Sequence, residues 1–187
     1  PYDELSMKEY EPAEISRSDL SESLLLLSAL GVSNFQSFSW FEAPPAKALD
    51  SAKSFLIAIG AISEKGELTK TGEGLRELPV HPRIAKLLLE GQAIGLGKLA
   101  CELAALLSEP GGRVPAGYEI ENDLWLRWED WKRNAGHPKN RGLERTCQQL
   151  LGLLKSNESG AEQSNVPTKQ LEEKVPGLLL SVYADRL

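Results

Sequence analysis

The residues of this chain that could do chemistry are few, and the most suggestive is a glycine-rich segment, GQAIGLGK (91–98). Like a phosphate-binding loop, it ends in Gly97-Lys98. However, five residues rather than four separate its first glycine from Gly97, and Leu99 stands where such a loop has serine or threonine. The segment therefore predicts a glycine turn between two helices, and Lys98 is not expected to bind phosphate.

The histidines and cysteines are not spaced as a catalytic or metal site. His81 and His137 have no suitable partner residues nearby in the sequence, which predicts capping or surface roles. Cys101 and Cys147 form no CxxC pair, so a zinc site is not expected and the composition favours a reducing, cytoplasmic setting. No Ser/His/Asp set, carboxylate pair or dinucleotide fingerprint is present. We therefore expect no catalytic residue, metal or cofactor in this chain, which would not be an enzyme by itself.

Basic residues gather in one part of an otherwise acidic chain. The net charge is −6, yet residues 123–155 hold seven lysines and arginines against four acidic residues. Because phosphate contacts come from lysine and arginine, any nucleic-acid contact is expected in this part. The candidate residues are Lys132, Arg133, Arg141 and Arg145. Ordinary solvated helix surface is the alternative for each of them.

Three tryptophans, Trp125, Trp128 and Trp131, recur every third residue in the same part of the chain. On a helix this spacing spreads them over a broad face. We expect them to pack in a helical bundle or between domains. Stacking of exposed indoles on bases is the alternative.

The composition predicts a mainly α fold. Leucine occurs 32 times and alanine 17 times, against 17 for valine, isoleucine and threonine together, and the first two favour helices. The 187 residues can bury a core, and no apolar run approaches the roughly 20 residues of a membrane span. We therefore expect a helical protein without a membrane segment.

The order of the predicted elements divides the chain in two after a connecting segment, residues 1–16. Two helices, a hairpin around Lys65-Gly66 and a short helix capped by Thr69 or Thr71 predict a winged helix over 17–80. Residues 81–187 predict a helical bundle, with an interruption of the last helix at Pro176. The hairpin is the candidate wing.

Several segments, in this order, resemble the helicase-associated region of DEAH/RHA-type ATP-dependent helicases. The more specific ones are EPAEISRSDLSESLLLLSALGV (11–32), WFEAPPAKALDSAKSFLIAIGAISEKGELTKTGEGLRELPVHPRIAKLLLEG (40–91) and ACELAALLSEPGG (100–112). Others are similar to the bacterial HrpB branch in particular, namely DLWLRWEDW (123–131), RGLERTCQQLLGLL (141–154) and PGLLLSVYADRL (176–187).

The resemblance implies a degenerate winged helix followed by a ratchet-like helical bundle. In the family these follow two RecA-like motor domains, which bind ATP and Mg²⁺ and hydrolyse the nucleotide. The first residue is proline, and we interpret the chain as a piece of a longer polypeptide, with 1–16 leaving the second motor domain. It would form part of the tunnel for a single strand of RNA or DNA and couple motor motion to strand translocation.

Two other functions remain open at this stage. A stand-alone winged-helix DNA-binding regulator predicts a basic recognition helix, whereas the 44–60 helix carries only Lys47 and Lys53, with Asp50. A protein-interaction scaffold predicts exposed tryptophans on the 123–133 helix. An adaptor protein that binds the wing would be a further partner of the helicase region.

Overall fold

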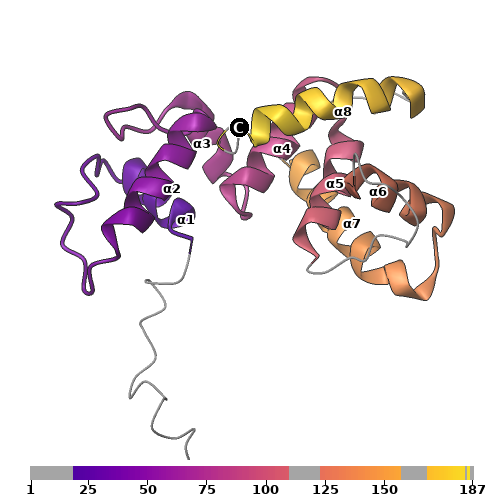
Figure 1. Ribbon diagram of the computed structural model, residues 1–187, viewed down its shortest axis with the longest axis horizontal. Helices are drawn as coiled ribbons and strands as arrows, with labels where there is room; N and C mark the ends of the chain where they lie inside the picture. The colour runs from indigo at the N-terminus through magenta and orange to yellow at the C-terminus, as the bar shows by residue number, and fades with distance from the viewer. Residues whose placement is uncertain (1–18, 110–122, 157–167, 184, 186–187) are drawn as a thin grey trace, which may run out of the picture. The chain divides into compact units, whose positions relative to one another are not determined.

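The computed structural model describes residues 19–109, 123–156, 168–183 and 185, with the backbone alone for a few at helix ends. The described part is mainly helical, which confirms the predicted fold class (Figure 1). The predicted connecting segment, 1–16, lies outside it. The chain divides into two compact units, Pro1–Glu77 and Leu78–Leu187. The proposed domains 17–80 and 81–187 stay predictions, although their boundary is close to this division.

The first unit is built from three helices, α1 (Ser21–Ala29), α2 (Ala46–Ala58) and α3 (Lys70–Arg76). Helix α1 packs against both of the others. Apolar side chains that recur at helical spacing are buried between them, as amphipathic helices require. They include Leu24, Leu25, Leu49, Phe55, Leu56 and Leu75.

The predicted hairpin is reduced to a single antiparallel bridge between Ile62 and Leu68 in the described chain. Gly66 forms its turn with φ +85°, and a Cβ on Gly66 would overlap the carbonyl oxygen of Ser33. Only glycine fits this turn, because both the dihedral angle and the close approach exclude a side chain. One bridge is not a pair of strands, so the winged-helix assignment stays a prediction.

The predicted cap of the short third helix is confirmed. The Thr69 hydroxyl oxygen accepts a hydrogen bond of 3.0 Å from the backbone N–H of Gly72, as an N-cap side chain does. The same hydroxyl donates to the carbonyl oxygens that precede the bridge, at Gly60 and Ala61. Thr69 therefore connects the start of α3 to the hairpin.

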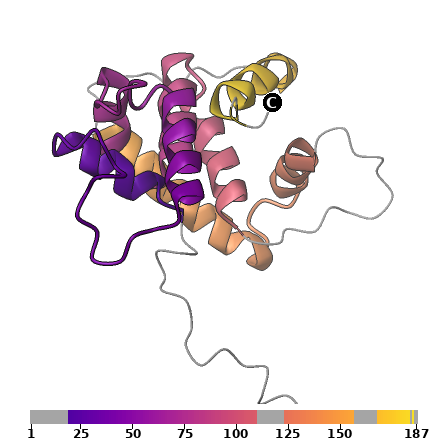
Figure 2. The same cartoon turned by 60° about the vertical axis from the view of Figure 1, so that its left-hand side comes forward.

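The second unit contains a central helix surrounded by others. In the described ranges its elements are α4 (Pro82–Ala93), α5 (Gly97–Ser108), α6 (Asp123–Arg133), the 3₁₀ turn η3 (Pro138–Asn140), α7 (Arg141–Ser156) and α8 (Thr168–Val182). Helix α5 packs against α4, α6 and α7 (Figure 2), and every residue from Leu99 to Leu106 is buried. The nearly continuous apolar sequence of α5 reflects this central position. No described helix combines the length and apolar character that a membrane span requires.

Helices α4 and α5 approach closely where Gly91 meets Ala100. A Cβ on Gly91 would overlap the Cβ of Ala100. The turn between the two helices includes Gly95 at φ +75°. The segment GQAIGLGK is thus a glycine turn between helices, as predicted, and its first glycine is needed for packing.

Helix α8 runs without interruption through Pro176, so the predicted break at this residue is wrong. Proline removes one backbone hydrogen bond from a helix and strains the preceding turn. Pro176 is exposed, whereas Val175, Leu178 and Val182 are buried, and α8 packs on α4. The buried apolar side favours the helix more than the proline opposes it.

The end of α8 is fixed to the start of α4 by Arg83. Its Nη1 donates to the carbonyl oxygen of Val182 at 2.7 Å and to Oδ1 of Asp185 at 2.6 Å, while Nη2 donates to Oδ2 of Asp185 at 2.7 Å. The guanidinium also lies 4.6 Å from the ring centroid of Tyr183. A two-pronged arginine–carboxylate pair is directional as well as strong, so it sets where α8 ends.

Candidate nucleic-acid interface

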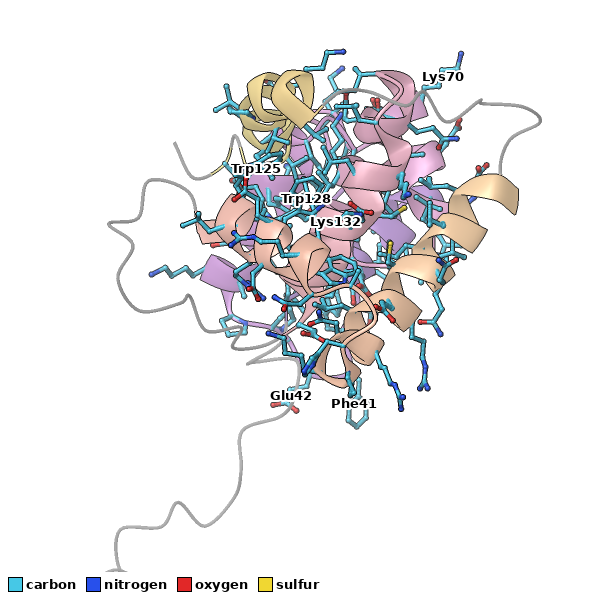
Figure 3. All side chains as sticks on the ribbon, turned by 90° about the vertical axis from the view of Figure 1, so that its right-hand side faces the viewer. Phe41, Glu42, Lys70, Trp125, Trp128 and Lys132 are labelled. Carbon is cyan, nitrogen blue, oxygen red and sulfur yellow. The ribbon has the colours of Figure 1, made fainter. Side chains whose placement is uncertain are left out.

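A buried carboxylate connects α5 to α6, the helix that carries two of the predicted basic residues. Glu102 lies on α5 and is only 5% exposed. Trp128 donates its indole N–H to Oε2 of Glu102 at 2.6 Å, and Lys132 donates from Nζ to Oε1 at 2.8 Å. Figure 3 shows Trp125, Trp128 and Lys132 along α6, and the two bonds to Glu102 place the donors of Trp128 and Lys132 on the side of α6 that packs against α5. Each carboxylate oxygen thus has a donor, which offsets the cost of burying the charge.

The tryptophans of α6 are buried, as predicted. Trp125, Trp128 and Trp131 are 8%, 6% and 7% exposed. The rings of Trp125 and Trp128 stack, with centroids 4.6 Å apart and an interplanar angle of 28°. Packing in the bundle is confirmed, and in this structure the indoles are not open to stack on bases or to dock a partner.

The basic residues predicted on α6 both have acidic neighbours. Lys132 is paired with Glu102 and keeps 44% of its side chain exposed. Arg133 is more exposed, at 66%, and its Nη2 lies 3.7 Å from Oε2 of Glu129 one turn earlier. Such an exposed pair contributes little stability and is easily exchanged. Arg133 is therefore the less constrained of the two.

The basic residues predicted on α7, Arg141 and Arg145, are both exposed and lie one turn apart on the same side of the helix. Neither forms an ion pair with a described residue. Glu144 lies beside Arg145 in the sequence, but its Oε1 accepts a hydrogen bond of 2.9 Å from the N–H of Gly136. Helix α7 therefore presents two guanidinium groups that form no ion pair within 4.0 Å among the described residues.

The sequence of α7 explains why the arginines face solvent. Leu143, Cys147, Leu150 and Leu154 recur every three or four residues and are buried, and the helix packs on α5. Arg141 and Arg145 project from the opposite, exposed side of the helix. The structure thus places two of the predicted residues on α6 and two on α7, and both helices pack on α5.

Glu102, the buried partner of the candidate ligand Lys132, is a residue that sequence reasoning missed. The signal that could have indicated it is a single acid within the apolar run of α5, LACELAALL (99–107). An acid is rarely buried unless it is paired, so its position predicts a basic or indole partner from another helix. Which partner it has depends on packing and could not be inferred from spacing.

Both cysteines lie in this same region as buried, free thiols. Burial raises the pKa of Cys101 from 9.0 to about 12, and the neighbouring Cys147 and Glu102 add to the increase. Burial also raises the pKa of Cys147 to about 11, with a contribution from Glu102 that Lys132 and Lys98 oppose. Both thiols are protonated at neutral pH and are poor nucleophiles.

The histidines cap helices, which confirms the predicted roles. Nδ1 of His81 accepts a hydrogen bond of 3.2 Å from the N–H of Arg83 at the start of α4. Nδ1 of His137 does the same for Lys139 at η3, also at 3.2 Å. Among the residues placed by the structure, no three histidine, cysteine or acidic side chains are grouped to hold a metal ion.

Known proteins with similar sequences are helicases, although no protein-family model matches the chain. The pre-mRNA-splicing factor ATP-dependent RNA helicase prp22 of Schizosaccharomyces pombe is 31% identical over 97 residues, which cover 52% of this chain. The probable ATP-dependent RNA helicase DHR2 of Saccharomyces cerevisiae is 31% identical over 101 residues, or 54% of this chain.

Solved structures extend the match to the whole chain. The crystal structure of the E. coli DExH-box NTPase HrpB superposes with a TM-score of 0.69, at 26% identity and over 100% of this chain. A second crystal structure, of the Escherichia coli DEAH/RHA helicase HrpB, gives a TM-score of 0.67 at 29% identity over 98%. The chain matches the helicase-associated region of DEAH/RHA-type helicases.

The predicted resemblance to the helicase-associated region is therefore confirmed. The chain spans only 8% and 14% of the two curated relatives and 20% of each HrpB chain. It thus corresponds to an accessory part of a helicase. The hairpin as a wing and the bundle as a ratchet stay predictions.

Proposed function

We propose that this chain lines part of the single-strand tunnel of an ATP-dependent RNA helicase and couples motor motion to strand translocation. The observation that carries the proposal is the structural match to HrpB over the whole chain. RecA-like motor domains in the same polypeptide would bind ATP and Mg²⁺ and supply the hydrolysis. RNA is the proposed strand because both curated relatives are described as RNA helicases.

The proposed strand contacts are Arg141 and Arg145 on α7, together with Lys132 and Arg133 on α6. Arginine and lysine bind the phosphate backbone, which is the same at every nucleotide. A translocating strand needs contacts of this sequence-independent kind. The acidic net charge of the chain does not oppose them strongly, because charges beyond about 10 Å are screened at physiological salt.

The packing of the second unit supports a mechanical role. Helix α7 contributes buried Leu143, Cys147 and Leu150 to its packing on α5, and α5 is buried along most of its length. The two arginines are thus held on a well-packed support. When the motor domains move, the packed helices of this unit would move together as a rigid body. The strand would then shift relative to Arg141 and Arg145, which stay fixed on α7.

The regulator and scaffold alternatives have less support. Helix α2 presents Lys47 and Lys53 with Asp50 between them, so it is not the basic helix that groove recognition needs. The scaffold hypothesis required exposed tryptophans, and those of α6 are buried. Binding of an adaptor protein to the hairpin stays a prediction.

The test of the proposal is RNA-stimulated ATP hydrolysis by the polypeptide that joins the motor domains to this chain. Replacing both arginines, R141A/R145A, is expected to raise the RNA concentration for half-maximal stimulation about tenfold or more. The matched control is K47A/K70A, which removes two exposed lysines from the first unit. Equal RNA dependence of the wild type and R141A/R145A would contradict the proposal.

A further inference from the structure

The four candidate phosphate ligands are not equivalent, because among the residues that the structure describes Lys132 alone of the four is held by a buried carboxylate. Glu102 is 5% exposed and its side chain is fixed by two hydrogen bonds, from Trp128 at 2.6 Å and from Lys132 at 2.8 Å. The Lys132 ammonium also lies 5.7 Å from the centroid of the Trp128 ring. The Glu102 carboxylate and the Trp128 ring thus hold the Lys132 ammonium on the side of α6 that faces α5.

The partner of Lys132 cannot easily be exchanged for a phosphate. If Lys132 leaves, Glu102 keeps one indole hydrogen bond but loses its neutralising cation in a buried site, which is costly. The pair of Arg133 with Glu129 differs, because the distance is 3.7 Å and the Glu129 side chain is 39% exposed. An exposed carboxylate regains water when its partner leaves, so Arg133 is available at low cost.

We infer that Glu102 is a positioning residue that withholds the charge of Lys132 from the strand, so that Arg141, Arg145 and Arg133 make the phosphate contacts. This inference rests on the proposed function, since it concerns the same interface. It predicts that Lys132 stabilises the attachment of α6 to α5 and adds little to RNA affinity. It also predicts that removing the charge of Glu102 creates an additional phosphate ligand.

The E102Q variant tests the inference because it changes the charge and keeps the shape. The amide oxygen of glutamine can still accept the N–H of Trp128, whereas its NH₂ group cannot accept from Lys132. The ammonium, already 44% exposed, then turns to solvent. We expect E102Q to bind a single-stranded oligouridylate about threefold to tenfold more tightly at low salt, with a salt slope steeper by about 0.7.

The control for net charge is E90Q, which removes an equal charge from the Lys86–Glu90 pair on α4, where Nζ and Oε1 are 2.7 Å apart. We expect its RNA affinity to match the wild type. Adding K132M to E102Q should cancel the gain. K132M alone should change the RNA affinity less than twofold. Circular dichroism shows whether E102Q folds, and if it does not, the affinity of K132M tests the inference.

The experiment uses the 187-residue chain, fluorescence anisotropy with labelled oligouridylate, and R141A/R145A as a reference. A loss of affinity in R141A/R145A without a gain in E102Q overturns the inference and leaves the proposed function standing. A large loss in K132M alone overturns it as well. If neither the wild type nor E102Q binds RNA, the inference and direct strand contact by this chain both fail.

Discussion

The indole nitrogen of Trp128 lies 2.6 Å from a carboxylate oxygen of Glu102, and this bond fastens α6 to the central helix of the second unit. A hydrogen bond to a buried charged group contributes about 1.5–3 kcal/mol, so W128F should lower the free energy of unfolding by about that amount. Urea denaturation followed by circular dichroism measures it. The control is W125F, since Trp125 donates to the half-exposed Glu129 at 3.2 Å, and a loss of under about 1 kcal/mol is expected. Equal losses of unfolding free energy in W128F and W125F would show that the bond to Glu102 stabilises the fold no more than the bond to Glu129.

Helices α4 and α5 approach so closely at Gly91 that a side chain larger than hydrogen does not fit there without a shift. G91A improves helix propensity by about 1 kcal/mol but forces a methyl group into the Cβ of Ala100, and overpacking of this kind costs about 1–3 kcal/mol. We expect a lower melting temperature for G91A. The double variant G91A/A100G should recover part of the loss. G152A on the exposed side of α7, where a Cβ meets nothing within 4 Å, should instead raise the melting temperature.

The pair of Arg83 with Asp185 holds the end of α8. In a double-mutant cycle with R83M and D185N, we expect a coupling free energy of about 1 kcal/mol or more, because the pair is two-pronged and mostly buried. The Lys86–Glu90 pair is the control, with an expected coupling of about 0.3–0.5 kcal/mol for a single i, i+4 pair whose glutamate is partly exposed. Hydrogen exchange of α8 amides should accelerate in R83M. Unchanged exchange would mean that α4 packing alone fixes this helix.

The buried thiols make stability depend on alkaline pH. The folded-state pKa values of Cys101 and Cys147, about 12 and about 11, lie above the ordinary value of 9.0. The unfolded chain therefore loses these protons first, and the free energy of unfolding should fall as the pH rises from about 9 toward 11. Below pH 9 the thiols should have no such effect. In C101A/C147A the decline above pH 9 should be shallower than in the wild type, and equal slopes would contradict the account.

The sequence predicted those features that depend on local patterns. Helical spacing predicted the helices, Thr69 or Thr71 was expected to cap the start of α3, and the extra residue before Gly97 excluded a phosphate loop. The tryptophans were correctly expected to be buried because three of them share one broad helix face. Each of these inferences uses neighbours within one or two turns of the residue concerned.

The features that the sequence did not reveal depend on contacts between distant residues. The continuation of α8 through Pro176 depends on apolar packing against α4, which outweighs the local preference of proline. The pairing of Lys132 with Glu102 joins residues 30 positions apart, and nothing in the spacing of α6 distinguishes Lys132 from Arg133. Candidate phosphate ligands could thus be proposed from charge, but the ion pairs that distinguish Lys132 from Arg133 could not be predicted.

The most direct test of the account is the affinity of this chain for single-stranded RNA and its dependence on salt. Titration of labelled oligouridylate at several salt concentrations gives the slope of log K against log salt. For R141A/R145A we predict about tenfold weaker binding and a slope shallower by about 1.4, that is, by two phosphate contacts. K47A/K70A, which removes the same charge elsewhere, should behave like the wild type. Identical affinity and slope in R141A/R145A and the wild type would contradict the claim that α7 presents the strand-binding arginines.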